Sequence, residues 1–361
     1  MANICSVGLG IPDHEIAQSD VKDLVQNLFP YDERKMKRLL PIFDNAEIDR
    51  RQLVVNKNWF SEHHTFEEKN NLYIKYAKKY SLEAIDHCLT NKEQLKENIP
   101  FDAIDLIIFV SSTGISTPSL DVHLMNERPF RENVSRMPLW GLGCAGGAIG
   151  LSRAYEWLST NPEKIALIVC CELCSLTFQK EDTKKSNWVG TALFGDGVGA
   201  ALLMGEQSSY LSYRKHPTPA IKRISSFTEK NSTSVMGWGV SERGLEVIFS
   251  KSIPALVKTV WKKHIISFLN DLFLTEKDIH SFITHPGGKK VLEAMEETLS
   301  ISNKKIIHSH YVLRNHGNMS SATVLYVLYE WMKETVSKEA KSVLSALGPG
   351  FSSELLLLEW N

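Results

Sequence analysis

An internal repeat constrains the fold of this chain more than any other feature of its sequence. A shift of 174 residues aligns GCAGGAIGLSRAYEWL (143–158) with GNMSSATVLYVLYEWM (317–332). The same shift aligns FDAIDLIIFVSSTG (101–114) with TEKDIHSFITHPGG (275–288), and each of these segments is an apolar, strand-like run that ends in small residues. Two copies of one α/β unit predict a duplicated fold, in which the halves bury their faces against each other.

Reactive side chains lie at equivalent positions of the two copies. Cys144 aligns with Asn318, and Ser111 aligns with His285. Each residue also has a commoner structural role, because buried cysteines, hydrogen-bonded loop histidines and helix-capping asparagines are frequent. Their matched positions instead favour a shared site, since halves that meet face to face bring Cys144, His285 and Asn318 together.

Cys144 follows a turn and precedes a helix. Four glycines lie between residues 141 and 147, which permits a tight turn and a close approach of backbone or substrate. Apolar residues then recur at helical spacing from Ala148 to Leu158. Free amide groups and the helix dipole at such a position favour a thiolate, so we expect the pKa of Cys144 to be lowered.

The composition excludes several classes of protein. In the 361 residues, 41 basic side chains balance 42 acidic ones, and no basic run indicates a nucleic acid partner. The longest apolar runs, such as IALIVCC, are too short to span a membrane, and the N-terminus lacks the pattern of a signal peptide. We therefore expect a soluble cytoplasmic protein without a membrane span.

The cysteines favour a reducing compartment, because six of them are too few for a disulfide framework in a chain of this length. Cys170, Cys171 and Cys174 lie close in the sequence, and a metal site is the alternative interpretation of this group. The group continues a buried strand, however, and lacks a second pair of ligands at zinc spacing. The sequence therefore predicts neither a metal ion nor a bound cofactor.

The apolar patterns indicate two α/β halves, one over residues 1–210 and one over residues 211–361. We expect a polar connection between them at 206–235, with room for one strand, and a polar loop at 179–188, QKEDTKKSNW. The predicted elements are a helix from Ser19, a helix at 66–90, strands at 104–110 and 164–171, a helix at 251–270 and a final strand.

Two local motifs need separate interpretation. The Thr117–Pro118 step is a candidate for a cis peptide bond. Gly195, Gly197 and Gly199 imitate part of a dinucleotide-binding motif, but they precede a strand-like run and no helix follows them. A Rossmann-type site is therefore not predicted.

The motifs GLGCAGGA, LFGDG, ITHPGG, HGNMSSA and ALGPGF occur in this order along the chain. Together they resemble the motifs of thiolase-fold condensing enzymes, and most closely those of the type III polyketide synthases, the chalcone synthase-like family. VSSTGISTPS and CELCSLTF make the chain similar to the alkylpyrone synthases of bacilli. The resemblance covers nearly the whole chain. It implies a duplicated, five-layered αβαβα fold, a homodimer, and an acyl-CoA starter and malonyl-CoA as substrates.

The resemblance also implies roles for individual residues. Cys144 is expected to accept the acyl group as the nucleophile, His285 to exchange protons with it, and Asn318 to donate to a developing oxyanion. Phe194 matches an aromatic gatekeeper, and Thr117 matches a position that reaches across the dimer interface in relatives. The other residues that match the walls of a substrate cavity are Ser112, Glu172, Cys174, Thr177, Ser320, Gly348, Pro349 and Gly350.

Two positions depart from the family pattern. The second gatekeeper phenylalanine aligns with Val247, which predicts a roomier cavity, and a lysine often used on coenzyme A phosphate aligns near Asn45. Other basic residues are therefore expected to clamp the phosphates, while a solvated surface is the alternative interpretation of the basic stretch 31–60. The residues that we expect to bind coenzyme A are Arg50, Arg51, Lys57, Gly287 and Gly288.

The resemblance therefore implies an acyltransferase. It would load a starter, expected to be a fatty acyl group, onto Cys144 and extend it by decarboxylative condensation with malonyl-CoA to tri- or tetraketide pyrones or resorcinols. A ketoacyl synthase of the type III fatty-acid initiating class uses the same trio for a single condensation and is the main alternative. A Cys-His-Asn thioester hydrolase is a further alternative, although the internal duplication is foreign to papain-like hydrolases.

Overall fold

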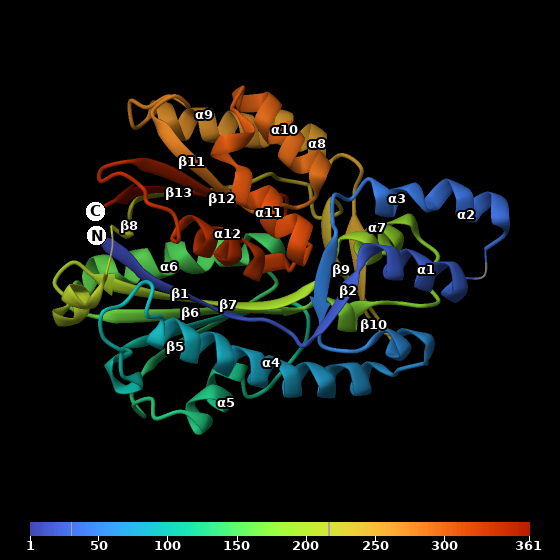
Figure 1. The fold of residues 1–361 in the computed structure, drawn as a ribbon, viewed down its shortest axis with the longest axis horizontal. Helices are drawn as coiled ribbons and strands as arrows, with labels where there is room; N and C mark the ends of the chain where they lie inside the picture. Colours follow the sequence, from blue (N-terminus) through green and yellow to red (C-terminus); the bar gives the residue numbers. More distant parts are fainter. Residues whose placement is uncertain (30, 216) are drawn as a thin grey trace.

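Nine strands form one mixed sheet within the part of the chain that the computed structural model describes, residues 1–29, 31–215 and 217–361. The sheet folds back on itself, so that helices α6 (Gly146–Thr160) and α12 (Thr323–Trp331) lie between its two halves (Figure 1). In spatial order the strands are β11 (Ile279–Thr284), β12 (Lys341–Gly348), β13 (Ser352–Trp360), β8 (Pro219–Thr228), β1 (Ala2–Gly10), β7 (Asp196–Gly205), β6 (Ile165–Leu173), β4 (Leu106–Ser111) and β5 (Ser135–Trp140).

The two halves of the sheet join at β1 and β8. At this seam Ala2 aligns with Ile221 and Asn3 with Ala220, whereas β1 pairs with β7 along nearly its whole length. Each half combines parallel and antiparallel pairs, since β4 is parallel to β5 and β6, and β11 is parallel to β12. Strands β4 and β11 come from the repeated segments, so the sheet reflects the duplication seen in the sequence.

The central helical layer brings the two repeated helices together. Their apolar side chains form one core with the inner faces of both sheet halves; its members include Ala148, Leu151, Ala154, Leu158, Val324, Leu325 and Leu328. A Cβ atom at Gly147 would lie 2.3 Å from the carbonyl oxygen of Ser321. Glycine therefore allows the start of α6 to approach the start of the second repeated helix.

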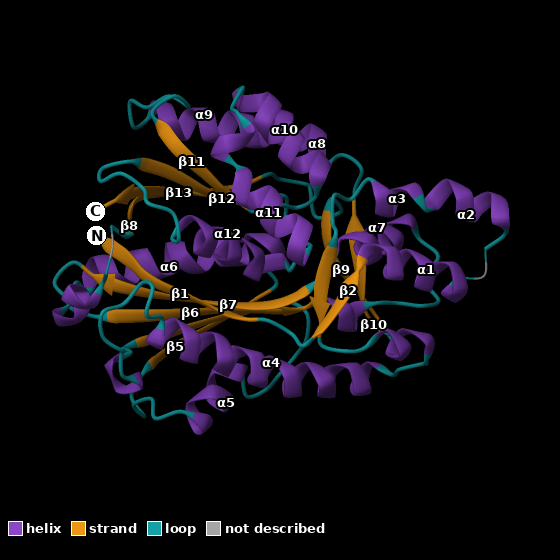
Figure 2. Ribbon diagram, viewed as in Figure 1, coloured by secondary structure: helices purple, strands orange, loops and turns teal. Residues whose placement is uncertain are grey.

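Helices cover both outer faces of the folded sheet (Figure 2). One face carries α4 (Phe66–Thr90) and α5 (Leu120–Glu127), and the other carries α8 (Ile253–Leu256), η6 (Val257–Trp261), α9 (Lys262–Asn270) and α10 (Lys289–Leu299). A capping box formed by Thr65 and Glu68 fixes the start of α4. Across the described residues, no helix has both the length and the apolar character that are needed to cross a membrane. The order of layers is the predicted five-layered αβαβα fold.

Most of the remaining elements gather at one end of the layers, on the right in Figure 1. They include two small antiparallel sheets, in which β2 pairs with β3 and β10 pairs with β9. The helices and strands of this end are β2 (His14–Ala17), α1 (Gln18–Leu28), α2 (Glu33–Leu39), α3 (Pro41–Asp44), β3 (Arg50–Leu53), η1 (Lys57–Ser61), η4 (Cys174–Thr177), α7 (Lys185–Leu193), β9 (Met236–Ser241) and β10 (Gly244–Phe249). Helix α11 (Ile307–His316) instead packs against α12 and reaches β3.

Most predicted elements are present, and the exceptions have local causes. The predicted helix at 251–270 consists of α8, η6 and α9 in succession. The predicted polar loop at 179–188 is wrong in its second part, because α7 begins at Lys185 in a polar segment that carries no apolar periodicity before Trp188. Strand β5 was not predicted, since Pro138 interrupts its pattern, yet proline is tolerated on an edge strand.

Candidate active site

Cys144 lies in a short 3-10 helix, η3 (Gly143–Ala145), that leads directly into α6. Gly143 has a φ angle of 49°, in the left-handed region that favours glycine, and a Cβ atom there would lie 2.8 Å from the ring of Pro349. The side chain of Cys144 is buried, with 7% of its surface exposed. The predicted glycine turn and helix start are therefore present, and they hold the thiol where the two halves meet.

Asn318 reaches Cys144 from the second half. The Sγ atom of Cys144 lies 3.9 Å from Oδ1 of Asn318, to which the thiol donates. The same Oδ1 atom accepts a hydrogen bond of 2.8 Å from the backbone N–H of Ser320, and Nδ2 donates over 3.3 Å to the carbonyl oxygen of Gly287. These contacts fix the orientation of the amide and leave its second N–H free of a protein partner within the described chain.

His285 follows β11 and is held by its backbone, whose N–H donates over 2.8 Å to the carbonyl oxygen of Ser345. Its side chain is 3% exposed, and neither ring nitrogen has a hydrogen-bond partner among the described residues. Buried polar atoms are nearly always paired in folded proteins. The imidazole is therefore available to a bound substrate or to the thiol of Cys144.

One cavity of about 490 Å³ is lined by Cys144, His285 and Asn318 together. Basic side chains gather along its wall: Arg38, Lys185, Lys251, Lys289 and Lys290. Within the described chain only Lys289 among them has a carboxylate partner, Glu293 at 4.0 Å. Lys289 and Lys290 also open the first turn of α10, where backbone N–H groups favour anions. The cavity thus joins a reactive trio to a positively charged wall.

Burial sets the protonation states of Cys144 and His285 in the site without substrate. Desolvation raises the pKa of Cys144 to about 12, although hydrogen bonds from Ser320 and Asn318 act in the opposite direction. Desolvation also lowers the pKa of His285 to about 3. The expectation of a lowered Cys144 pKa is therefore wrong for the substrate-free site, because loss of water outweighs the helix terminus and leaves a neutral thiol beside a neutral imidazole.

Comparison with known families decides the identity of this site. The model described as "Chalcone and stilbene synthases, N-terminal domain" matches residues 1–207, and its C-terminal counterpart matches residues 225–360. The chain belongs to this family, the type III polyketide synthases. It is accordingly an acyltransferase that condenses acyl units in a malonyl-CoA-dependent reaction.

Individual relatives agree with this assignment. The synthase is 45% identical over 361 residues to a Bacillus subtilis (strain 168) protein named "Putative chalcone synthase". The alignment covers 100% of this chain and 99% of that protein. The crystal structure of 1,3,6,8-tetrahydroxynaphthalene synthase from Streptomyces coelicolor A3(2), a bacterial type III polyketide synthase, has a TM-score of 0.91 at 27% identity and covers 99% of both chains. A structure of CsyB complexed with CoA-SH shares the fold, with a TM-score of 0.88, 23% identity and full coverage of both chains.

The rings of Phe194 and Phe249 lie between the Cys144 cavity and a second, smaller pocket of the synthase. The ring of Phe194 lies 5.5 Å from that of Phe249 and 6.0 Å from that of Trp238. Phe249 lines the cavity with Cys144, whereas Phe194 and Val247 line a smaller pocket. The sequence analysis missed Phe249, although alternation along β10 puts positions 247 and 249 on one face of the strand and could have identified it.

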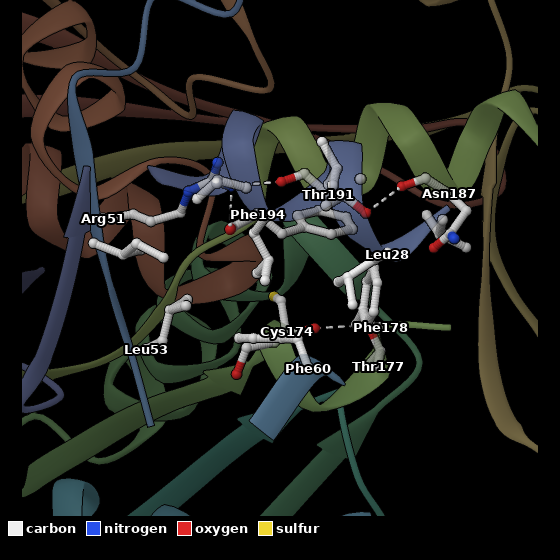
Figure 3. A pocket seen from close by; sticks show the side chains of 17 residues that line it. Leu28, Arg51, Leu53, Phe60, Cys174, Thr177, Phe178, Asn187, Thr191 and Phe194 are labelled. Atoms are coloured by element: carbon white, nitrogen blue, oxygen red, sulfur yellow. Dashed lines mark hydrogen bonds between the residues drawn. The ribbon is translucent and has the colours of Figure 1, made fainter. Parts of the chain in front are cut away.

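Cys174 and Thr177, predicted as cavity-wall residues, line that smaller pocket beside Phe194 (Figure 3). Cys170 and Cys171, the neighbours of Cys174 in the cysteine group, belong to different apolar cores on opposite faces of β6. Successive strand residues point to opposite faces, so the three thiols do not converge on one point.

Glu172 links the two halves in the interior, through Ser112 of the first half and Ser321 of the second. The carboxylate of Glu172 accepts hydrogen bonds from the hydroxyl of Ser112 at 3.0 Å, the backbone N–H of Ser112 at 3.1 Å and the hydroxyl of Ser321 at 2.6 Å. Burial raises the pKa of Glu172 to about 7. Ser321 lies three residues after Asn318, so Glu172 fastens the asparagine loop to the first half. Neither Ser112 nor Glu172 belongs to the described wall of the Cys144 cavity.

The loop at 348–350 packs against the nucleophile turn. A Cβ atom at Gly348 would lie 2.6 Å from the Cβ atom of Ala145, and the backbone of Gly350 has a φ angle of 127°. Thr117 precedes a cis peptide bond to Pro118, as the sequence suggested, and its side chain is exposed. Thr117 is not part of the described wall of the Cys144 cavity.

The predicted coenzyme A residues divide into two groups. Gly287 and Gly288 line the cavity of Cys144 as expected. Arg50 and Lys57 are exposed outside its described wall, and Arg51 is 1% exposed. The guanidinium of Arg51 donates to the carbonyl oxygens of Thr191 and Phe194 and to the side chain of Gln18.

The structure therefore corrects the assignment of Arg51 to coenzyme A binding. Its side chain is enclosed by protein and holds the backbone of Phe194 in place. Burial lowers its pKa to about 9, while the charge of Asp196 opposes this shift. The sequence pattern RRQL could not distinguish Arg50 from Arg51, because alternate residues of a strand differ in burial only once the partner elements are known.

Proposed function

We propose that this synthase loads a fatty acyl group from coenzyme A onto Cys144 and extends it with malonyl-CoA to tri- or tetraketide pyrones or resorcinols. The observation that carries the proposal is the cavity in which Cys144, unpartnered His285 and Asn318 meet below a basic wall. Thioester exchange, decarboxylation and condensation each require a group that this trio contains.

The first step transfers the starter to the enzyme. A ring nitrogen of His285 takes the proton of the Cys144 thiol, and the thiolate attacks the carbonyl carbon of the acyl-CoA. When the tetrahedral intermediate collapses, the coenzyme A thiolate leaves and takes the proton back from the imidazolium. Because the buried thiol and imidazole are each more stable neutral, the ion pair exists only while both partners face each other.

The second step generates the carbon nucleophile. Loss of carbon dioxide from malonyl-CoA leaves an enolate, whose oxygen needs hydrogen-bond donors in place before the charge develops. The free N–H of Asn318 Nδ2 and a protonated ring nitrogen of His285 are the proposed donors. An aspartate at position 318 would repel the enolate, whereas the amide donates without a change of charge. The carbanion attacks the carbonyl carbon of the Cys144 thioester, the Cys144 thiolate leaves, and a β-ketoacyl-CoA forms. Thioester exchange then returns the lengthened chain to Cys144 and releases coenzyme A for the next round.

The basic wall is the proposed binding site for the coenzyme A phosphates. Arg38, Lys185, Lys251 and Lys290 have no carboxylate partner in the described chain, so their charges are free for phosphate groups. Gly287 and Gly288 open the path past the first turn of α10. These residues replace Arg50, Arg51 and Lys57 in our assignment.

A fatty acyl starter is supported by the apolar second pocket and by Val247, which leaves room beside Phe194. Competition among hexanoyl-, lauroyl-, stearoyl- and aromatic coenzyme A esters, with the products identified by mass spectrometry, tests this choice. We expect multiply extended products from a fatty ester; a clear preference for an aromatic ester would contradict the starter assignment. A single condensation that requires carrier protein would instead indicate ketoacyl synthase chemistry, although the family match disfavours it.

We also propose that the synthase acts as a homodimer in the cytoplasm. Strand β5 ends the sheet, and the side chains of Trp140 and Ile115 beside it are 54% and 47% exposed. An exposed sheet edge with large apolar side chains is a typical site of association. Light scattering of the wild type and of Trp140→Glu tests the dimer: we expect a dimeric wild type and a weakened variant. A monomeric, active wild type would contradict it.

A further inference from the structure

We propose that His316 is a positioning residue, which holds Asn318 in place for the decarboxylation step through a hydrogen bond to Gln52. The inference rests on the proposed function, in which Asn318 donates to the developing enolate oxygen. His316 is the last residue of α11 and lies two residues before Asn318. It does not belong to the described wall of the Cys144 cavity, so its effect on catalysis has to act through the segment 316–318.

The segment 316–318 packs tightly against residues 193–195. Phe194 and Asn318 form a β-bridge, in which the N–H of Asn318 donates over 2.8 Å to the carbonyl oxygen of residue 193 and the N–H of Gly195 donates over 3.1 Å to that of Asn318. A Cβ atom at Gly195 would lie 2.3 Å from the carbonyl oxygen of His316, so a larger residue does not fit there. The place of Asn318 therefore depends on what holds these two segments.

Strand β3 lies against both segments of the bridge. Cβ atoms at Gly195 and Gly317 would lie 3.3 and 3.7 Å from the Cβ atom of Arg51. The guanidinium of Arg51 donates over 2.8 Å to the carbonyl oxygen of Phe194 (Figure 3). The next residue, Gln52, points to the opposite face of the strand, and its side chain contacts the end of α11. Two adjacent residues of β3 thus hold the bridge, Arg51 from one segment and Gln52 from the other.

The hydrogen bonds of Gln52 define the direction of its contact with His316. Nε2 of Gln52 donates over 3.1 Å to Oε2 of Glu15, which lies opposite it in β2, and over 3.4 Å to the carbonyl oxygen of Asn315. Since both partners of this nitrogen are acceptors, the amide oxygen of Gln52 faces His316, 2.7 Å from Nδ1. An amide oxygen can only accept, so Nδ1 of His316 carries the proton and donates.

Burial keeps His316 in the neutral form that makes this single bond. Desolvation lowers the pKa of His316 to about 4; the charge of Arg50 acts in the same direction, and that of Glu15 opposes it. A neutral imidazole has one N–H, and here Gln52 receives it. The ring packs edge-on against Tyr326, with 5.1 Å between the centroids. Removal of either partner of the bond therefore leaves the other unpaired in the interior.

A displaced Asn318 would affect one step of the reaction. Its amide is proposed to donate to the enolate oxygen that forms as carbon dioxide leaves, whereas transfer of the starter uses the thiol of Cys144 and the imidazole of His285. A displacement of about 1 Å in a positioned group can slow a step about 100-fold. Loss of the bond between His316 and Gln52 should therefore slow decarboxylation and spare the acylation of Cys144.

Variants of His316 test the inference through these two steps. His316→Leu removes the donor, and His316→Asn puts an amide N–H near the position of Nδ1; His308→Leu, on the same helix and half-buried beside Glu334, is the matched control. We expect kcat for release of labelled carbon dioxide from malonyl-CoA to fall about tenfold to 100-fold in His316→Leu, with KM and the rate of Cys144 acylation changed less than about twofold. His316→Asn should regain most of this rate, and His308→Leu should keep it.

The partner side of the bond gives a second test. Gln52→Met removes the acceptor and should cause the same selective loss, and adding His316→Leu to it should slow decarboxylation little further, since both changes remove one bond. Losses that multiply in the double variant would overturn the inference, as would equal losses in both steps or a His316→Asn variant no better than His316→Leu. If Asn318→Asp leaves decarboxylation unchanged, the proposed function of the amide fails. If Asn318→Asp slows decarboxylation and His316→Leu does not, only the role of His316 fails.

A neutron crystal structure of the wild type tests the bond without a variant. After exchange into heavy water, we expect deuterium on Nδ1 of His316, directed at Oε1 of Gln52. Deuterium on Nε2 alone, or a Gln52 side chain turned so that its amide nitrogen faces the ring, would overturn the inference.

Discussion

The starts of α6 and of the second repeated helix are alike in backbone and different in chemistry. Both follow a glycine with positive φ, Gly143 and Gly317, and both lead through a 3-10 turn into a buried helix. At the next position the first copy carries Cys144 and the second carries Asn318. The comparison teaches that one scaffold positions two functions: a nucleophile from the first half and an anion-stabilising donor from the second.

Substituting the nucleophile should produce the largest effect. In Cys144→Ala no thioester forms, so we expect polyketide formation to fall by about 10⁴-fold or more. Product formation from an acyl-CoA and malonyl-CoA measures this loss. Cys88→Ala, a buried cysteine far from the cavity wall, is the control and should keep most of its activity. Near wild-type turnover of Cys144→Ala would show that Cys144 is not the nucleophile, so that the first half would not supply the reactive group.

Substituting Asn318 should show that the two halves act in different steps of the reaction. We expect Asn318→Asp to acylate Cys144 but to release carbon dioxide from malonyl-CoA about 10²–10³-fold more slowly, because a carboxylate replaces an oxyanion donor. Acylation is measured by intact-protein mass and decarboxylation by labelled carbon dioxide. The exposed substitution Asn58→Asp is the matched control. Equal losses in both steps would mean that Asn318 does not act specifically on the enolate.

Substituting His285, which lies in the second half, should slow the reactions of the Cys144 thiol in the first half. His285→Gln removes the ring nitrogen, free of partners among the described residues, that takes the proton of the Cys144 thiol, so the reactive thiolate no longer forms beside an imidazolium. We expect alkylation of Cys144 by iodoacetamide at pH 7 to slow by about tenfold or more and its pH profile to move to higher pH. An unchanged profile would show that the imidazole does not pair with the thiol.

Charge removal on the cavity wall should have a smaller effect, confined to binding. We expect Lys251→Ala and Lys290→Ala each to raise KM for malonyl-CoA about five- to tenfold with little change in kcat, as for loss of one charge-assisted phosphate contact. Lys57→Ala, which lies outside the described wall, serves as the control. If Lys57→Ala alone raised KM, the original assignment from the sequence would be restored.

The link through Glu172 should have the smallest effect on activity, and we expect to see it as a pH dependence of stability. Its pKa is raised to about 7 in the folded state, whereas the unfolded value is 4.5. The unfolded state therefore releases this proton first, so the contribution of Glu172 to stability falls as pH rises from about 4.5 to about 7 and is constant above.

In Glu172→Gln this contribution is absent. The free energy of unfolding of the variant, measured relative to the wild type by denaturant titration, should rise by up to roughly 3 kcal/mol across that pH window. Glu132→Gln, at an exposed position, is the control. A difference between variant and wild type that does not change with pH would mean that Glu172 titrates normally.

The repeat made much of the fold predictable, because identical spacing of apolar residues and glycines in both copies specifies equivalent elements. The repeat also predicted that Cys144, His285 and Asn318 meet in one cavity, since each of them lies at an end of a repeated element. The basic wall was not predictable in the same way. Lys185, Lys251 and Lys290 lie on α7, before α8 and on α10, and only the packing of these separate elements makes them neighbours.

Burial explains the other differences between expectation and structure. Arg50 and Arg51 are adjacent and chemically identical, yet one is exposed and the other is enclosed beneath Phe194. The sequence places Cys144 at a helix start, which favours a thiolate, but it does not reveal how completely water is excluded. The boundary at residue 210 and the cytoplasmic location stay predictions.

The most direct test follows the acyl group on the enzyme. Wild-type synthase is mixed with lauroyl-CoA, and the intact mass and the peptide that carries the label are determined before and after addition of malonyl-CoA. The account predicts one lauroyl group as a thioester on Cys144, followed by larger masses on the same residue and then free polyketide. A label on another residue, or polyketide formation with no acyl group ever on Cys144, would contradict it.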